Sequence, residues 1–231
     1  MKHSLLVATG NKGKLAELRE LLADLPLDLL GPSDVFAIPP NVVEDGATFV
    51  ANATKKARQY AAASSMMCLA DDSGLEVDVL GGAPGVRSAR FAHERATDAE
   101  NRAALLSALD ALGLDDPVSL RTVDLEVNRQ RGSLYAARFK CALVLIDPFS
   151  DERPIVSEGV CEGSIVRTAR GNRGFGYDPL FLVEGTDRTM AELSSDEKNA
   201  ISHRGRALAA IRPHVAQAIA SRERRMAALF G

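Results

Sequence analysis

The stretch HSLLVATGNKGKLAELRELLADL, residues 3–25, joins an apolar run to a helix-like segment through a short polar turn. The apolar run from His3 to Ala8 is typical of a buried strand. After the turn, leucines recur at helical spacing, at positions 15, 18, 21, 22 and 25, which predicts a helix with one apolar face. A strand, a glycine-containing turn and a helix in this order are the first unit of an α/β pattern.

The alternation of strand and helix continues beyond this first unit. A second helix is expected over residues 47–64, ahead of a short apolar run that ends in the aspartate pair Asp71 and Asp72. A third helix is expected over residues 98–112, with Thr97 or Asp98 as its cap. Strands and helices that alternate in this way favour a sheet covered by helices.

The second half of the chain has a different pattern. Residues 134–146 and 154–166 are rich in strand formers, which predicts a hairpin or meander in a mixed sheet. A last helix is expected over residues 201–219, and Pro213 is expected to kink or break it. We therefore predict one α/β domain over residues 1–231, with a long mixed sheet flanked by helices and two lobes with a central cleft.

Composition excludes several classes of protein. The chain has 231 residues, 46% hydrophobic and 26% charged, with a net charge of -3, which is typical of an ordinary soluble protein and disfavours a nucleic-acid-binding role. Its three cysteines are odd in number and widely spaced, so neither a disulfide framework nor a zinc site is supported and the cytoplasm is favoured. The N-terminal apolar run is too short for a signal peptide or membrane span, so we expect no membrane association.

The turn TGNKGK, residues 9–14, has the features of a phosphate cradle. The N-terminus of a helix presents unpaired backbone N–H groups and the positive end of the helix dipole. Thr9 and Asn11 add polar side chains, and Lys14 adds a charge. The sequence lacks the P-loop and dinucleotide-binding patterns, and a helix capped by Asn11 with a solvated lysine is the alternative.

A second polar group lies at the start of the next predicted helix. Asn52 and Lys56 are four residues apart and share a helix face, with Glu44 and Asp45 in the preceding loop. A lysine and a carboxylate can therefore approach one ligand from adjacent elements. A solvated helix face with acidic residues near its N-terminus is the alternative.

The aspartate pair Asp71 and Asp72 follows an apolar run and precedes Ser73 and Gly74. We expect the strand to end here, which places two carboxylates where open α/β sheets usually bind ligands. Hard oxygen ligands suit Mg²⁺, so Asp72 with Glu44 can hold a magnesium ion. An Asp-Ser-Gly turn is the alternative, and it explains one aspartate better than two.

Two later segments carry further candidate contacts. The segment GFGYDPLF, residues 174–181, places Phe175 and Tyr177 among small residues, which suits stacking on a flat ring; a core strand followed by a turn is the alternative. In residues 194–204, Ser194 and Glu197 have capping-box spacing. Cationic side chains at Lys198, His203 and Arg204 cluster near two helix ends, where they can face an anion or solvent.

Together these motifs resemble the inosine/xanthosine triphosphate pyrophosphatase family, also called the noncanonical purine NTP pyrophosphatase or Ham1-like family. The resemblance runs nearly end to end, and five motifs in the same order carry it: ATGNKGKLAEL, EDGATFVANATKKA, ADDSGLEVDVLGGAPGVRSARFA, GFGYDPLF and AELSSDEKNAISHRGRAL. It implies a long mixed sheet with helices in two lobes around a substrate cleft, and a homodimer. It also implies Mg²⁺-dependent hydrolysis of ITP, dITP and XTP to the monophosphate and pyrophosphate, which keeps deaminated purines out of DNA and RNA.

The resemblance also assigns roles to individual residues. It implies that Glu44 and Asp72 hold the metal and that Asp72 accepts a proton. The reaction itself leaves Asp71 as either a catalytic group or an orienting group. The implied substrate contacts are Thr9, Gly10, Asn11, Lys12, Gly13, Lys14, Lys56, Ser73, Phe175, Gly176, Tyr177, Asp178, Lys198, His203 and Arg204.

The chain departs from the family pattern in two places. Arg87 stands where many relatives have tyrosine, and the polar segment 114–133 is longer than in many relatives. Two other functions fit the same motifs less well. One is the related Maf-type pyrophosphatase activity on modified pyrimidine triphosphates, and the other is a nucleotide sensor without hydrolysis, which the acidic set of Glu44, Asp71 and Asp72 disfavours.

Overall fold

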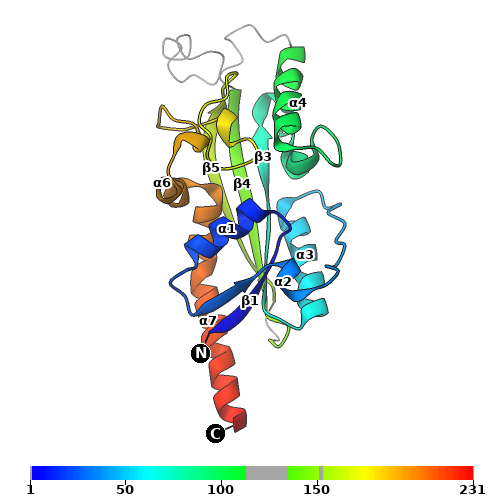
Figure 1. Ribbon diagram of the computed structural model, residues 1–231, viewed down its shortest axis with the longest axis vertical. Coiled ribbons are helices and arrows are strands. Elements are labelled where there is room, and N and C mark those ends of the chain that lie inside the picture. The colour runs from blue at the N-terminus through cyan, green and yellow to red at the C-terminus, as the bar shows by residue number, and fades with distance from the viewer. Residues whose placement is uncertain (1, 113–134, 151–152, 231) are drawn as a thin grey trace. The chain divides into compact units, whose positions relative to one another are not determined.

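The computed structural model describes residues 2–112, 135–150 and 153–230 and contains a six-stranded sheet with helices (Figure 1). The strand order is β2-β1-β3-β4-β5-β6; β1 is parallel to β2 and β3, and β5 is antiparallel to β6. The strands are β1 (His3–Ala8), β2 (Leu27–Leu30), β3 (Cys68–Val77), β4 (Tyr135–Ile146), β5 (Ile155–Ile165) and β6 (Phe181–Val183). The helices are α1 (Lys12–Leu21), α2 (Pro32–Val35), α3 (Phe49–Ser64), α4 (Asp98–Ala111), α6 (Ser195–Ile201) and α7 (His203–Phe230). This confirms the predicted α/β class with a mixed sheet.

The chain divides into two compact units. Unit 1 comprises Met1–Asp72, Cys141–Gly159 and Arg204–Gly231, and unit 2 comprises Ser73–Lys140 and Val160–His203. The single domain over residues 1–231 and the central cleft stay predictions, and the segment 114–133 lies outside the described residues.

The core of unit 1 forms on one face of its strands. Alternate residues of β1, Leu5 and Val7, point to this face, where α1 and α7 pack together. Helix α3 contacts β1 but adds no residue to this cluster, so it covers the opposite face. The main members of the cluster are Leu5, Val7, Leu18, Leu22, Leu69, Leu143, Leu145, Leu208, Ile211 and Val215.

Unit 2 has a core of its own. Aromatic and aliphatic side chains of its strands pack against α4, and the rings of Phe139 and Phe181 lie 4.5 Å apart between centroids. Helix α4 begins at a capping box in which Thr97 accepts from the backbone of Glu100. This confirms Thr97 as the cap.

Strand β3 differs from its prediction. We expected it to end at Asp71 and Asp72, but it continues to Val77. Its pairing with β1 ends at Ala70, opposite Ala8, so the two aspartates follow the last residue paired with β1. The strand continues because β4 lies on its other side in the sheet. Both carboxylates face cationic groups inside unit 1 and not a turn to solvent. Short strand β2 was not predicted.

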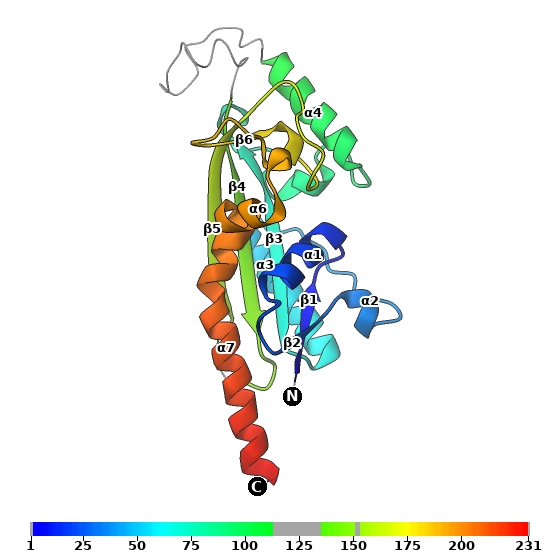
Figure 2. The same cartoon turned by 60° about the vertical axis from the view of Figure 1, so that its left-hand side comes forward.

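Helix α7 is longer than the predicted helix, and Pro213, where we expected a kink or a break, does not break it. It runs without a break from His203 to Phe230 with Pro213 inside it, and it reaches the C-terminal end of the described chain (Figure 2). A proline in a helix interior removes one backbone hydrogen bond. Leu208, Ile211 and Val215 on either side of Pro213 are buried in the core of unit 1, and this packing holds the helix together. Among the described helices, none is both long enough and apolar enough to cross a membrane.

The core of unit 1 gives a first prediction. Leu143 is fully buried, whereas Leu112 is 41% exposed. We expect Leu143→Ala to lower the free energy of unfolding by about 2–5 kcal/mol, because it leaves a cavity in a packed core. The matched change Leu112→Ala is expected to cost less than about 0.5 kcal/mol. Urea unfolding of both variants checks this, and equal losses would contradict it.

Candidate active site

The predicted phosphate cradle is the N-terminus of α1 in unit 1. Asn11 caps the helix, because its Oδ1 accepts from the N–H groups of Gly13 at 2.9 Å and Lys14 at 3.1 Å. Thr9 Oγ1 accepts from the N–H of Asn11 at 3.2 Å. The helix cap that the sequence offered as the alternative is therefore present. The role of residues 9–14 as a phosphate cradle stays a prediction.

Lys14 does not extend into solvent. Its Nζ lies 2.6 Å from Asp71 Oδ1, and Asp71 is fully buried. The other oxygen, Asp71 Oδ2, accepts from Arg204 Nε at 2.8 Å and from the thiol of Cys141 at 3.3 Å. Arg204 in turn donates from Nη1 to Glu17 of α1. The structure thus connects two predicted site residues, Lys14 and Arg204, through Asp71.

Lys56 lies beside the other aspartate. Its Nζ is 3.4 Å from Asp72 Oδ1, 3.2 Å from Glu44 Oε1, and 2.7 Å from the backbone oxygen of Asp71. All three groups belong to unit 1. Lys56 and Glu44 therefore meet from adjacent elements, and their contact with a common ligand stays a prediction.

The loop that carries Glu44 is fastened to α3. Asn52 is buried, and its Oδ1 accepts from the N–H of Gly46 at 2.7 Å. A Cβ on Gly46 would lie 2.7 Å from this oxygen, so the loop needs glycine at that position. The shared face of Asn52 and Lys56 thus holds Glu44 near Asp72.

The pKa values of the two aspartates shift in opposite directions. Burial alone would raise the pKa of Asp71, but the charges of Arg204 and Lys14 hold it well below its usual range. Burial also raises the pKa of Asp72, and Glu44 adds to this rise, while Lys56 and Lys14 oppose it without cancelling it. Asp71 is therefore a fixed anion, and Asp72 is the carboxylate that binds a proton more readily.

The residues around Asp72 fit a magnesium ion. Asp72 Oδ2 is buried and has no hydrogen-bond partner among the described residues. Mg²⁺ is usually held by one or two protein carboxylates and completes its shell with waters and substrate phosphates. Glu44 and Asp72 supply that number, although the described part of the chain contains no group of three or more His, Cys, Asp or Glu side chains suited to a metal.

In unit 2, the predicted ring-stacking segment forms a loop closed by an ion pair. Lys198 Nζ lies 2.6 Å from Asp178 Oδ2, which also accepts from the N–H of Phe175 at 3.0 Å. The same ammonium lies 5.0 Å from the centre of the Phe175 ring. Asp178, Lys198 and Phe175 thus form one cluster, and their contacts with a ligand stay predictions.

Tyr177 is surrounded by other residues of unit 2. It is buried, and its hydroxyl donates to the backbone oxygen of Ser88 at 2.9 Å. Burial raises its pKa. Ser88 also lies against Gly74, where a Cβ would be 2.4 Å from Ser88 Oγ. This close approach explains the glycine that follows Ser73 in β3.

His203 and Arg87 of unit 2 have different surroundings. His203 is buried and stacks on Phe139, with 4.9 Å between ring centres. Arg87, the departure from the family pattern, is exposed and lies 3.4 Å from Glu94. The substrate roles of the segments 174–181 and 194–204 stay predictions.

Sequence reasoning missed four residues that hold site residues in place. Asp98 accepts from the N–H of Gly176 at 2.7 Å, and Arg102 donates to its backbone oxygen at 2.7 Å. Asp98 and Arg102 are four apart on α4, which is a readable signal for a shared face. Glu17 and Cys141 contact Arg204 and Asp71, and only the three-residue spacing of Glu17 from Lys14 hinted at this.

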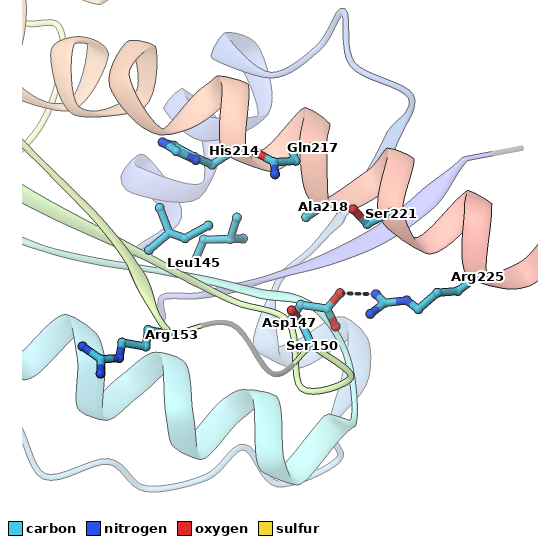
Figure 3. A pocket seen from close by; sticks show the side chains of 10 residues that line it. Leu145, Asp147, Ser150, Arg153, His214, Gln217, Ala218, Ser221 and Arg225 are labelled. Atoms are coloured by element: carbon cyan, nitrogen blue, oxygen red, sulfur yellow. Dashed lines mark hydrogen bonds and ion pairs between the residues drawn. The ribbon is translucent and has the colours of Figure 1, made fainter.

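A separate hollow in unit 1 lies between the end of β4, the start of β5 and α7 (Figure 3). Asp147 there accepts from Arg225 at 3.0 Å and from Arg222 at 2.7 Å. None of the predicted site residues lines this hollow. The ion pairs fasten the β4–β5 connection to α7.

Comparison with known proteins identifies a family. Residues 5–214 match the model of the Ham1 family. A dITP/XTP pyrophosphatase of Anaeromyxobacter is 47% identical over 223 residues, covering 90% of this chain and 94% of that protein. One of Salmonella typhimurium is 45% identical over 203 residues, covering 88% and 93%. A solved HAM1 protein structure from Coxiella burnetii has a TM-score of 0.76 at 41% identity, covering 93% of this chain and 99% of that one.

The raised pKa of Asp72 gives a prediction on stability. A carboxyl whose pKa is higher in the folded state stabilises the fold below its unfolded pKa, about 4, and loses that contribution as pH rises through the folded value. Ionised Asp72 therefore opposes folding at neutral pH, and we expect Asp72→Asn to raise the melting temperature at pH 7. The difference should vanish near pH 4, as measured by thermal unfolding with a chelator.

The control for this prediction is Asp45→Asn. Asp45 is exposed, and its hydrogen bond to Lys55 lowers its pKa, so the same substitution is expected to leave the melting temperature at pH 7 unchanged or slightly lower. A lower melting temperature for Asp72→Asn than for the native chain at pH 7 would contradict the assigned direction.

Two glycines of unit 2 give a third prediction. Gly174 and Gly176 both have positive φ, 74° and 60°. A Cβ at Gly174 would lie 2.0 Å from Asp178 Oδ2, whereas a Cβ at Gly176 meets nothing within 4 Å. We expect Gly176→Ala to cost only backbone strain, about 1–2 kcal/mol, and Gly174→Ala to cost more, because it also displaces Asp178. Urea unfolding compares them, and equal costs would contradict this.

Proposed function

The chain belongs to the Ham1 family, and we propose that it hydrolyses noncanonical purine nucleoside triphosphates, dITP, XTP and ITP, to the monophosphate and pyrophosphate. The observation that carries this proposal is the cluster in unit 1 around Asp72. One of its carboxylate oxygens has no hydrogen-bond partner in the described chain, and cationic and acidic groups lie close to it. The named dITP/XTP pyrophosphatases that align over about nine-tenths of the chain support it. Such an activity removes deaminated purines from the pool of nucleic-acid precursors.

The reaction adds one water across the bond between the α and β phosphates. Water attacks the α phosphorus, pyrophosphate leaves, and one proton of the water must be accepted. Asp72 suits the role of acceptor, because burial raises its pKa and its Oδ2 has no partner in the described chain. Lys14 and Lys56 supply positive charge against the triphosphate.

The family generally needs a divalent metal, and we propose Mg²⁺ held by Glu44 and Asp72. When bound, it would neutralise phosphate charge and lower the pKa of a water. Lys56, which lies between the two carboxylates, keeps them near each other in the metal-free chain. The proposed substrate contacts also include residues 9–14 and Ser73. In unit 2 they include Phe175, Gly176, Tyr177, Asp178, Lys198 and His203.

Selectivity is proposed to depend on the purine edge. Hypoxanthine and xanthine have an oxygen acceptor at C6, where adenine has an amino donor. A buried donor that loses its acceptor can reject the wrong base by roughly 10⁴-fold. A homodimer and a cytoplasmic location, where nucleotide precursors are held, complete the proposal, and light scattering would decide the oligomeric state.

The activity is tested by pyrophosphate release from dITP, XTP, ITP, ATP, GTP and CTP, with Mg²⁺ and with a chelator. We expect metal-dependent release from the first three and little from the others. Asp72→Asn is expected to lower kcat by about 10²- to 10⁴-fold, the usual contribution of a positioned acid or base. As control, Asp24→Asn changes an exposed carboxylate paired with Arg212 and should retain the native rate. Native turnover by Asp72→Asn would remove Asp72 from the mechanism.

A further inference from the structure

A ring of charged side chains, completed by the backbone of α1, connects α1, β3 and α7 in unit 1. Lys14 Nζ lies 2.6 Å from Asp71 Oδ1, Asp71 Oδ2 accepts from Arg204 Nε at 2.8 Å, and Arg204 Nη1 donates to Glu17. Lys14 and Glu17 are three residues apart on α1, so they lie on neighbouring positions of one helix face. The ring therefore starts and ends on the helix whose N-terminus forms the predicted phosphate cradle.

The ring is closed to solvent at its centre. The side chains of Asp71 and Arg204 are 0% and 1% exposed, and those of Lys14 and Glu17 are 14% and 15% exposed. Both oxygens of Asp71 are occupied, Oδ1 by Lys14 and Oδ2 by Arg204 and Cys141. A carboxylate with both oxygens bonded to cations is poorly placed to accept a proton from water.

Asp72 differs from its neighbour in this respect. Its Oδ2 has no hydrogen-bond partner among the described residues, although the atom is buried. Successive residues of a strand point to opposite faces, so Asp71 and Asp72 have different surroundings. One aspartate has the contacts of a structural anion, and the other has an oxygen to which a ligand can bind.

We propose that Asp71 is a positioning residue that holds the Lys14 ammonium ready for the triphosphate, and that Arg204, anchored by Glu17, holds Asp71. This inference rests on the proposed function for the identity of the ligand. It separates the roles of the two aspartates: Asp72 acts on the reacting atoms, and Asp71 acts through Lys14. It also gives Arg204 a role inside unit 1, as the residue that holds Asp71, while its substrate contact stays a prediction.

The physical reason lies in the freedom of the lysine side chain. A lysine has many rotamers and loses that freedom when it binds a phosphate. A lysine already held in one position loses less on binding, so its phosphate contact is stronger. Asp71 supplies this hold from a position that water does not reach, where the charge of Arg204 keeps it ionised.

The test is a double-mutant cycle on Lys14 and Asp71 in the full chain. The probe is inorganic tripolyphosphate, whose binding is measured by calorimetry in the presence of a chelator, and XTP turnover with Mg²⁺ is measured in parallel. We expect Lys14→Ala to weaken tripolyphosphate binding about 10-fold or more, the loss for one hydrogen bond to a charged group. Asp71→Asn is expected to weaken it about threefold or more in the native background and less than twofold in the Lys14→Ala background.

The kinetic readout separates positioning from chemistry. If Asp71 acts through Lys14, Asp71→Asn raises KM for XTP more than it lowers kcat, and this effect disappears when Lys14 is alanine. A fall in kcat of equal size in both backgrounds, with KM unchanged, would overturn the proposal. Asp24→Asn is the matched control, because Asp24 pairs with Arg212 of α7 outside the ring and should change neither quantity.

A second variant covers loss of folding. If Asp71→Asn unfolds, Glu17→Gln tests the ring from its partly exposed end. We expect a smaller rise in KM, and we expect this rise to be absent in the Lys14→Ala background. An equal rise in KM in both backgrounds would overturn the proposal. The two substitutions could have non-additive effects on tripolyphosphate binding while the native chain releases no pyrophosphate from dITP or XTP. That result would contradict the proposed function and leave the positioning role intact. Normal pyrophosphate release together with additive effects of the two substitutions on tripolyphosphate binding would contradict the positioning role. Absence of tripolyphosphate binding by the native chain would contradict it too.

Discussion

The ion pair between Asp71 and Arg204 is the interaction on which the arrangement of unit 1 depends. It joins the middle of β3 to the first turn of α7 at a place with almost no solvent exposure. Removing one partner of such a pair leaves a buried charge and typically costs about 3–5 kcal/mol. Because Lys14 and Glu17 attach α1 to the same pair, the three elements hold one another in register.

Asp72, in contrast to Asp71, lowers the stability of the fold at a position that the proposed function needs. Its burial raises its pKa, so the ionised form is held at neutral pH against a cost in folding free energy. Lys56 and Lys14 reduce that cost but leave one carboxylate oxygen without a partner in the described chain. A site that binds a metal and a triphosphate needs such an incompletely satisfied group, and natural proteins commonly accept lower stability at functional positions.

Local features of the fold could be predicted because neighbouring residues determine them. The strand at His3–Ala8 and the helix caps at Asn11, Thr97 and Ser194 all follow from short-range patterns and are present. One local prediction was wrong because sheet pairing overrides it. The strand expected to end at Asp71 continues beside β4. At Pro213, where we expected a kink or a break, core packing keeps the helix unbroken.

The sequence by itself determined the α/β class, the caps, and the set of polar residues that a phosphate and metal site would need. Hydrophobic period and capping chemistry act over a few residues and can therefore be read directly. Only the tertiary structure decided which of these residues meet. Arg204 contacts Asp71 and Glu17 across 133 and 187 residues of sequence, and no periodic pattern extends over such distances. The different surroundings of Asp71 and Asp72, adjacent in sequence, arise because successive strand residues face different neighbours.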